Sequence, residues 1–282
     1  MRLWPISFVL LLAACDIVDQ PIPPQEAGGN NGDGPVPRRV LLEDFTGHRC
    51  NNCPQATNTG LQLQQLYGDR VVLVGVHAGP SNFVAPINPS PDGSYTTDFR
   101  TEAGNIYAQT YGVTFLPVGM ISRRTINGSQ LHSHNAWPER VATIIDEEAA
   151  MDMWFSIISH DNNAGTISAQ LKVAVLQPIT GVHNVTIYLT EDHVVDWQLN
   201  SAVTPPDVPD YDHRHVLRAN LNGTWGAELI GTSAAVGDTL TYEVESFAIA
   251  NTWNIANCSL VAYVYQATND EVLQVVEDKI ID

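Results

Sequence analysis

Residues 39–54 read RVLLEDFTGHRCNNCP, and this stretch decides the first half of the fold. Its first seven residues have the length and apolar character of a buried β-strand. Residues 46–49 then favour a turn. A helix is predicted to open at the C-x-x-C pair Cys50–Cys53, because Pro54 lacks a backbone N–H and therefore suits the first turn of a helix.

Helix and strand patterns continue to alternate after this stretch. Ala56, Leu63, Leu66 and Tyr67 give an apolar stripe at helical spacing, and Gly68 ends it. The patterns that follow predict a strand at 71–76, a helix at 99–111, a strand at 116–121 and a helix at 137–150. Such alternation predicts an α/β domain over residues 38–150.

The position of the C-x-x-C pair indicates thiol chemistry. At a strand-to-helix junction, Cys50 would lie beside free backbone N–H groups and the positive end of the helix, and both favour its thiolate. The thiolate is the species that attacks a disulfide. We therefore expect Cys50 to be the exposed attacking thiol, helped by the positive charge of Arg49 and His48. Cys53, one turn later, would resolve the mixed disulfide.

Two other interpretations of the pair stay open. A structural zinc site needs four ligands and usually a second cysteine pair, whereas only Cys258 and scattered histidines remain. A static structural disulfide would stabilise the start of the helix and react with nothing. Near the pair, His77 could line the same crevice, although a plain polar strand end is the simpler interpretation. The segment Pro80–Gly93 is an insertion that could cover the site or be a passive loop.

Residues 41–53 resemble the active-site strand and loop of thioredoxin-like proteins. The resemblance implies a thioredoxin-like fold for residues 38–150 and catalytic roles for Cys50 and Cys53. Asp44 falls where many of these proteins carry a buried acid that shuttles protons. Pro117 falls where they carry a cis-proline that faces the disulfide and supports the substrate backbone.

Two departures from that pattern leave the direction of any redox reaction open. The tryptophan that usually precedes the first cysteine is replaced by Arg49. The middle pair, Asn51-Asn52, matches neither the common reductant dipeptide nor the common oxidant dipeptide.

From Met151 onward the apolar pattern changes to a period of two residues, which is typical of half-buried strands. Seven segments have this character: 153–159, 167–175, 185–190, 215–219, 240–245, 258–266 and 272–279. They predict an all-β, immunoglobulin-like sandwich domain over residues 151–282. Cys258 shares the apolar face of Leu260, Ala262 and Val264, so we expect a buried and unreactive thiol.

Polar side chains that can bind or react are most concentrated in this half at YDHRHVLR, residues 211–218. His213 and His215 would share one face of a strand, but a metal site needs a third ligand, and none is evident. Residues 211–226, which end in NGTWG, are similar to a motif of the twenty-eight-kilodalton outer-membrane protein family of Gram-negative lipoproteins. Residues 260–274 are similar to a second motif. The resemblance implies an outer-membrane lipoprotein and supplies no established activity.

The first fourteen residues are expected to form a secretory signal. A positive start at Arg2 precedes an apolar run that is too short to span a membrane and ends in Leu-Ala-Ala-Cys at Cys15. This ending resembles the bacterial lipobox, so Cys15 is predicted to carry lipid after cleavage. The residues between Cys15 and Pro37 are rich in Pro and Gly, which predicts a flexible linker between the lipid and the folded part.

The charge of the chain restricts its partners. With 13 Lys and Arg against 31 Asp and Glu, its net charge is -18, so nucleic acid is a poor partner. No glycine-rich phosphate loop or nucleotide fingerprint is present in the sequence, so no organic cofactor is expected. The predicted partners are the membrane, through the lipid, and envelope proteins that carry thiols or disulfides.

Two hypotheses for function follow. In the first, Cys50 is the nucleophile of a lipid-anchored thiol–disulfide oxidoreductase, with Cys53 as the resolving thiol, Asp44 as the proton shuttle and Pro117 as the substrate platform. In the second, the protein is a non-enzymatic surface or periplasmic binding lipoprotein whose C-x-x-C is a structural disulfide.

Overall fold

A computed structural model of the chain describes residues 35–281. The predicted signal, Cys15 and most of the predicted linker lie outside these residues. The last linker residue, Pro37, is already part of the fold, because the Gln274 side chain donates to its carbonyl at 3.1 Å. Within residues 35–281, no helix is both long and apolar enough to cross a membrane.

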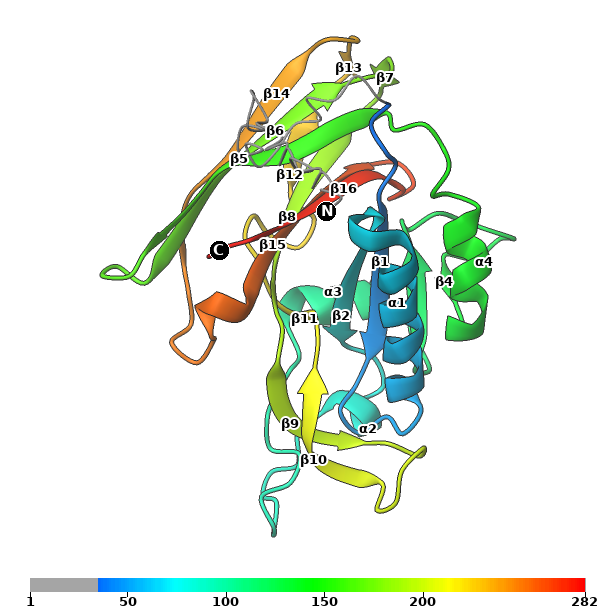
Figure 1. Cartoon of the computed structure of the whole chain (residues 1–282), viewed down its shortest axis with the longest axis vertical. Coiled ribbons are helices and arrows are strands. Elements are labelled where there is room, and N and C mark those ends of the chain that lie inside the picture. The colour runs from blue at the N-terminus through cyan, green and yellow to red at the C-terminus, as the bar shows by residue number, and fades with distance from the viewer. Residues whose placement is uncertain (1–34, 282) are drawn as a thin grey trace, which may run out of the picture.

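The helices and strands alternate in the first half, whereas the second half consists almost entirely of strands (Figure 1). The elements of the first half are β1 (Val40–Thr46), α1 (Cys53–Tyr67), β2 (Val71–His77), α2 (Ser81–Val84), α3 (Glu102–Thr110), β3 (Val118–Ile121), β4 (Leu131–His132) and α4 (Trp137–Ala142). The strands of the second half are β5 (Met151–Asp161), β6 (Thr166–Val175), β7 (Ile179–Thr180), β8 (His183–Glu191), β9 (Val194–Leu199), β10 (Asp207–His213), β11 (Val216–Asn220), β12 (Ala227–Ile230), β13 (Ser233–Ala234), β14 (Thr239–Ala248), β15 (Cys258–Gln266) and β16 (Val272–Lys279).

The strand predicted from residues 39–45 is β1, and it is buried along its whole length. It pairs in parallel with β2, from Val40 opposite Val71 to Thr46 opposite His77, and antiparallel with β3. Parallel strands need a crossover between them, and α1 provides it. Strands β2, β1, β3 and β4 are therefore neighbours in that order.

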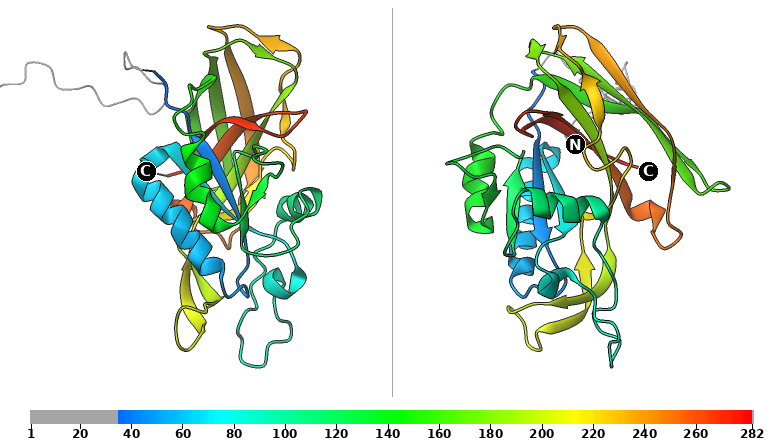
Figure 2. Two further views of the ribbon diagram at one scale, coloured as in Figure 1. Left: turned by 90° about the vertical axis from the view of Figure 1, so that its right-hand side faces the viewer. Right: turned by 180° about the vertical axis from the view of Figure 1, so that it is seen from behind.

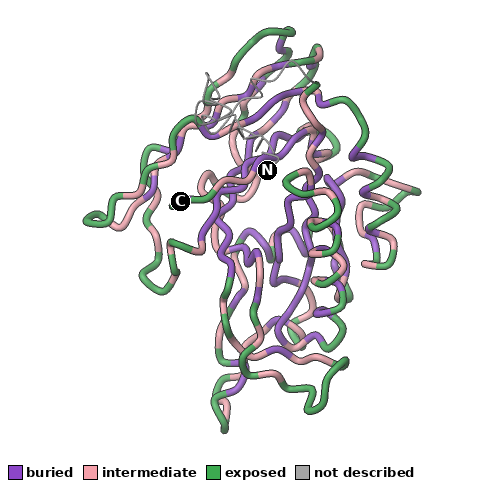
Figure 3. Tube along the Cα trace, viewed as in Figure 1, coloured by how far each residue is buried: buried purple, intermediate pink, exposed green. Residues whose placement is uncertain are grey.

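Alternate residues of β1 face different helices. Val40 and Leu42 pack with Ala56 and Leu63 of α1 and with residues of α4. Leu41 and Phe45 pack instead with α3 on the opposite face of the sheet. Burial on both faces explains why the strand is an unbroken apolar run apart from its two acids. Figure 3 shows this buried centre between exposed helix faces.

All seven strand segments predicted in the second half are confirmed. Strands β5, β6 and β14 form one antiparallel sheet, and β8, β15 and β16 belong to another. The two sheets lie face to face (Figure 2). Apolar side chains of both sheets meet in a shared core, as a sandwich requires. Cys258 lies in this core with no exposed surface, and burial raises its pKa to about 12, so its predicted burial is confirmed.

The larger sheet of the sandwich continues into the first half. Its order is β16-β15-β8-β11-β2-β1-β3-β4, so one sheet crosses residue 150, where the sequence analysis divides the chain. The join is β11, which pairs antiparallel with β8 and in parallel with β2 at Val216 and Gly75. A side chain at Gly75 would come within 3.3 Å of the Arg214 carbonyl, so glycine allows this close approach.

Several sequence expectations need correction. Helix α1 begins at Cys53, so Cys50 lies in the turn before the helix. Leu66 is 70% exposed and does not belong to the buried stripe of α1. Helix α4 ends at Ala142, well short of the predicted residue 150. The hairpin of β9 and β10 was not predicted, and it forms a separate small sheet at the lower end of the molecule in Figure 1.

Candidate functional site

The C-x-x-C pair lies where the sequence predicts it, between the carboxyl end of β1 and the start of α1. Cys50 and Cys53 form a disulfide, with their Cα atoms 5.4 Å apart. The turn is held by backbone hydrogen bonds from Cys50 N–H to the Gly47 carbonyl at 3.0 Å and from Cys53 N–H to the Cys50 carbonyl at 3.2 Å. Pro54 occupies the first turn of α1, where its missing N–H leaves no bond unmade.

The expectation that Cys50 is exposed is wrong. Cys50 and Cys53 are each only 1% exposed. The burial of Cys50 arises because two segments from elsewhere in the chain cover the loop. One is the short helix α2, whose Phe83 carbonyl accepts from the Arg49 N–H at 3.0 Å. The other is the hairpin of β9 and β10.

The hairpin is hydrogen-bonded directly to the loop that carries the disulfide. The side-chain amide of Gln198 donates to the Cys50 carbonyl at 3.0 Å and to the Gly47 carbonyl at 3.3 Å. The backbone N–H of Leu199 donates to the His48 carbonyl at 2.8 Å. No sequence pattern marks this contact, because it depends on a fold that brings residue 198 to residue 50.

Asp44 is buried on the α1 face of the sheet. Its Oδ2 accepts from the Thr57 hydroxyl at 3.4 Å, and Thr57 is one helical turn after Cys53. Its Oδ1 has no hydrogen-bond partner among the described residues. Burial raises the pKa of the carboxyl to about 7, and the hydrogen bond from Thr57 opposes the rise only in part. Asp44 can therefore hold or release a proton near neutral pH.

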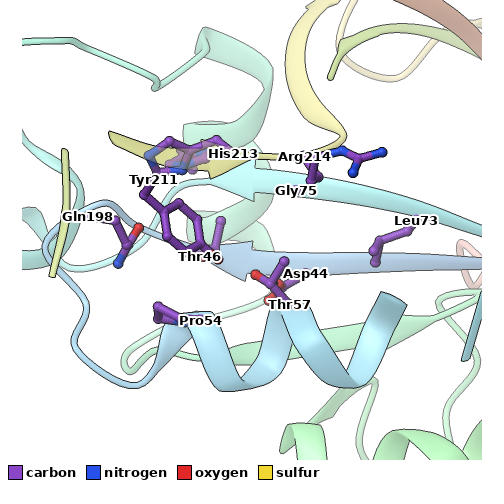
Figure 4. A pocket seen from close by; sticks show the side chains of 11 residues that line it. Asp44, Thr46, Pro54, Thr57, Leu73, Gly75, Gln198, Tyr211, His213 and Arg214 are labelled. Carbon is purple, nitrogen blue, oxygen red and sulfur yellow. The ribbon is translucent and has the colours of Figure 1, made fainter. Parts of the chain in front are cut away.

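A small cavity adjoins Asp44 (Figure 4). Its volume is about 20 Å³, which is room for about one water molecule. Thr57 and Pro54 of α1 line one wall, and Tyr211 and His213 of β10 reach in from the hairpin. Burial raises the pKa of Tyr211, with a further contribution from Asp44, so its phenol stays protonated. The cavity is thus built from both halves of the chain.

His77 lies in this cavity, so the simpler interpretation of a plain polar strand end is wrong. Its ring stacks on Phe99, with ring centroids 4.8 Å apart, and meets the edge of His213 at 5.6 Å. Burial, reinforced by His213, lowers the pKa of His77 well below its usual value. Burial also lowers the pKa of His213 to about 4. Both imidazoles are therefore neutral at pH 7.

Pro117 lies at the same end of the sheet. The Leu116–Pro117 peptide bond is cis, as the resemblance implies. The next residue, Val118, begins β3 and pairs with Phe45, just before the loop that carries the disulfide. The sequence-predicted residues Asp44, Cys50, Cys53 and Pro117 are thus brought to one region of the fold.

His213 and His215 do not share the face of one strand, contrary to expectation. His213 ends β10 and points into the cavity, whereas His215 has a positive φ of 52° and lies between β10 and β11. The N–H of His215 donates to Asp192 at 2.7 Å, away from the disulfide. Residues 35–281 contain no group of three metal-ligating side chains.

Comparisons with known proteins identify relatives of the chain. The sequence profile of the family described as outer membrane protein Omp28 matches residues 104–282. No curated protein sequence gives a significant match. Among solved structures, HBP35 of Porphyromonas gingivalis is 17% identical, with a TM-score of 0.63 over 87% of this chain and 76% of that chain. That likeness concerns the fold alone.

Two other solved structures are similar over different extents. A domain of the outer membrane lipoprotein Omp28 from Porphyromonas gingivalis is 24% identical and covers 47% of this chain and 89% of that chain, with a TM-score of 0.29. Protein AGR_C_4864 from Agrobacterium tumefaciens is 13% identical and covers 86% of this chain and 95% of that chain, with a TM-score of 0.49. Because the family profile spans more than half of the chain, this protein belongs to the Omp28 family of outer membrane proteins.

Proposed function

We propose that this outer membrane protein is a lipid-anchored thiol–disulfide oxidoreductase that acts through Cys50 and Cys53. The observation that carries the proposal is the combination of a disulfide at the start of α1 with a buried acid, Asp44, whose pKa is about 7. Perturbed acids beside a reactive pair are typical of catalytic sites. A disulfide that only stabilised the helix would have no need of such an acid.

The arrangement of the first half supports a thioredoxin-like unit. A parallel pair, β1 and β2, is joined by α1, and β3 and β4 extend the sheet on the other side of β1. The disulfide lies at the carboxyl end of β1, and the cis-proline Pro117 enters β3 beside it. These positions support the roles that the sequence resemblance implies.

The proposed reaction transfers two electrons between this disulfide and a protein dithiol. A substrate thiolate attacks the Cys50 sulfur, which forms a mixed disulfide and breaks the Cys50–Cys53 bond. Cys53 leaves as a thiolate and takes the proton of Asp44. The second substrate thiol, deprotonated by the Asp44 carboxylate, attacks the mixed disulfide and releases Cys50, which takes a proton from water. The substrate becomes a disulfide, and the same steps in reverse would reduce one.

The redox potential of the pair tests this proposal. The full chain would be equilibrated in detergent with glutathione buffers, and the Cys50–Cys53 disulfide quantified by trapping of free thiols. A potential above about -300 mV supports a redox-active pair, and one well below it contradicts the proposal. A Cys53→Ser variant should also accumulate mixed disulfides with protein thiols, whereas Cys50→Ser should not.

The burial of the pair favours a second candidate function. A disulfide between two residues that are each 1% exposed fits a structural bond in a non-enzymatic surface or periplasmic binding lipoprotein. In that case the potential falls below about -300 mV and neither single-cysteine variant traps a partner. The two functions therefore predict opposite results in the same experiment.

The lipid anchor is a separate part of the proposal. The Leu-Ala-Ala-Cys motif that ends at Cys15 supports it, and the Omp28 protein from Porphyromonas gingivalis is itself named an outer membrane lipoprotein. A labelled fatty acid should be incorporated into the wild-type protein and not into Cys15→Ser. Equal labelling of the two proteins would exclude Cys15 as the lipid site.

A further inference from the structure

The end of β9 lies against the disulfide loop and is joined to it by backbone hydrogen bonds. Leu199 and Ser201 donate their backbone N–H groups to the carbonyls of His48 and Asn51, at 2.8 Å and 2.9 Å. The intervening residue, Asn200, points its N–H the other way, to the Pro206 carbonyl at 2.8 Å. This alternation is that of an extended chain between two neighbours. The carbonyls of His48 and Asn51, in the turn that carries the disulfide, therefore form a carbonyl edge of two acceptors that an extended segment can reach.

The base of the hairpin is packed into the fold through β10, whose Tyr211 and His213 line the cavity. Strands β9 and β10 pair with each other and not with the large sheet. Two side-chain hydrogen bonds tie them to the loop between α2 and α3: Tyr95 donates to Asp207 at 2.6 Å, and Thr97 donates to Asp196. The hairpin tip, residues 201–207, is exposed. The end of β9, from Gln198 to the exposed tip, can open locally while β10 stays packed in the fold.

We propose that the carbonyl edge of residues 48–51 is the docking site for an extended segment of a partner protein that carries the reacting thiols, and that residues 198–201 occupy this edge as a displaceable lid. This inference rests on the proposed function and adds the partner's conformation and the way it gains access. Backbone pairing is a common way to bind extended peptides, because every residue carries the same N–H group.

Displacement of the lid leaves the number of backbone hydrogen bonds to the disulfide loop unchanged. The two N–H donors lost from Leu199 and Ser201 are replaced by two from the incoming segment, so the carbonyl of the buried residue His48 keeps a partner. Gln198, which donates to the Cys50 carbonyl, moves away with the lid. Cys50, now 1% exposed, then loses one of the two segments that cover its loop, and its sulfur opens to attack beside the paired partner.

The first test uses the full chain and two short, unstructured peptides that each carry a reduced cysteine pair. One peptide has free backbone N–H groups, and its match is N-methylated at the two residues beside the attacking cysteine. We expect the N-methylated peptide to reduce the disulfide about tenfold more slowly, because two net hydrogen bonds of roughly 1 kcal/mol each are lost in part. Equal rates would overturn the docking edge.

The second test releases the lid. Tyr95→Phe combined with Thr97→Val removes both hydroxyl donors and keeps the shape of each side chain. We expect reduction by the unmethylated peptide to become about tenfold faster, with no change in Thr241→Val, whose hydroxyl accepts from Lys172 on a distant sheet. Unchanged rates in the double variant would overturn the lid.

Hydrogen exchange of the wild-type chain gives a readout that needs no variant. The amides of Leu199 and Ser201 should exchange faster than those of β15 and should gain no protection from the N-methylated peptide. If these two amides exchange as slowly as the core, the lid is refuted, whatever the double variant does. If the potential of the pair lies below about -300 mV and neither peptide reacts, the proposed function fails instead.

Discussion

Glu43 and Asp44 are adjacent on β1, both are buried, and the fold treats them in opposite ways. Glu43 faces α3 and receives two hydrogen bonds from Arg123, at 2.7 Å and 2.8 Å, with neither side chain exposed. Asp44 faces α1 and receives one long hydrogen bond, from Thr57. The difference shows that burial alone does not set the state of a carboxyl group: partners decide whether it is held as an ion.

The surroundings of Glu43 form a clamp between the two halves of the chain. Tyr188 of β8 donates to Glu43 at 2.9 Å and exchanges a hydrogen bond with Tyr263 of β15 at 2.7 Å. The Arg123 guanidinium lies 4.7 Å from the centre of the Tyr107 ring. Every charge in this cluster has a partner of opposite sign, so we infer that the cluster stabilises the fold. Asp44 has none, so its proton is free to move.

The largest expected effect is on the clamp. Arg123→Met leaves Glu43 buried without its counter-charge and should lower the free energy of unfolding by about 3–5 kcal/mol. Urea unfolding measures the loss. Arg100→Gln, which breaks a partly exposed pair with Asp98, is the matched control and should cost less than about 1 kcal/mol. A similar small loss in Arg123→Met would mean that the cluster does not hold the halves together.

The charge on Asp44 should destabilise the fold, in contrast to the paired charge on Glu43. Its folded pKa of about 7 lies above the ordinary value of 3.8, so the folded protein loses stability as pH rises from about 4 to 7. Asp44→Asn removes this loss. Relative to wild type, the variant should gain up to about 4 kcal/mol above pH 7 and almost nothing near pH 4, since each pKa unit corresponds to about 1.4 kcal/mol.

Urea unfolding at several pH values would record this difference between variant and wild type. Asp69→Asn serves as the control, because it makes the same change at an exposed carboxylate that pairs with Arg39. A flat difference across the pH range for Asp44→Asn would show that Asp44 is ionised at neutral pH and cannot donate a proton to Cys53.

A smaller effect should follow from the loss of one hydroxyl in the clamp. Tyr188→Phe removes the donor to Glu43 and the acceptor of a hydrogen bond from Arg123 at 2.8 Å. We expect a loss of about 1–3 kcal/mol, because both partners remain buried. Tyr242→Phe, at a half-buried tyrosine of β14, should change stability by less than about 0.5 kcal/mol. Equal losses in the two variants would contradict a special role for Tyr188.

The sequence predicted β1, which carries Glu43 and Asp44, and the main strands of the second half. It did not predict the hairpin that covers the disulfide. Apolar periodicity identified β1 and the strands of the second half, because each of them buries a regular face. The hairpin of β9 and β10 was missed since it is half-exposed and its apolar residues follow no period. The burial of Cys50 was missed for the same reason: Gln198 lies 148 residues away in sequence, and no local pattern records that contact.

The joined sheet could not be predicted either. It depends on Val216 pairing with Gly75, a contact between two backbones that carries no side-chain signal other than the glycine. Arg123 gave no signal because an arginine after a strand is usually on the surface. By contrast, the resemblance on residues 41–53 correctly implied that Asp44 is buried and that the bond before Pro117 is cis.

The smallest effect sharpens the role of Thr57, the residue that moderates Asp44. Its hydroxyl donates to Asp44 and thereby holds the carboxyl pKa below the value that burial alone would give. Thr57→Val keeps the shape of the side chain and removes the donor, so the pKa of Asp44 should rise further above 7. The global stability at pH 5, where the carboxyl is protonated in the folded state, should change by less than about 1 kcal/mol. Carbon-13 NMR of the Asp44 carboxyl, titrated with pH, measures the shift directly.

Thr59→Val is the control on the same helix, because the Thr59 hydroxyl is exposed and donates to the Gln55 carbonyl. If Asp44 titrates identically in Thr57→Val and Thr59→Val, the 3.4 Å contact between Thr57 and Asp44 has no electrostatic consequence, and burial alone poises the acid beside the disulfide.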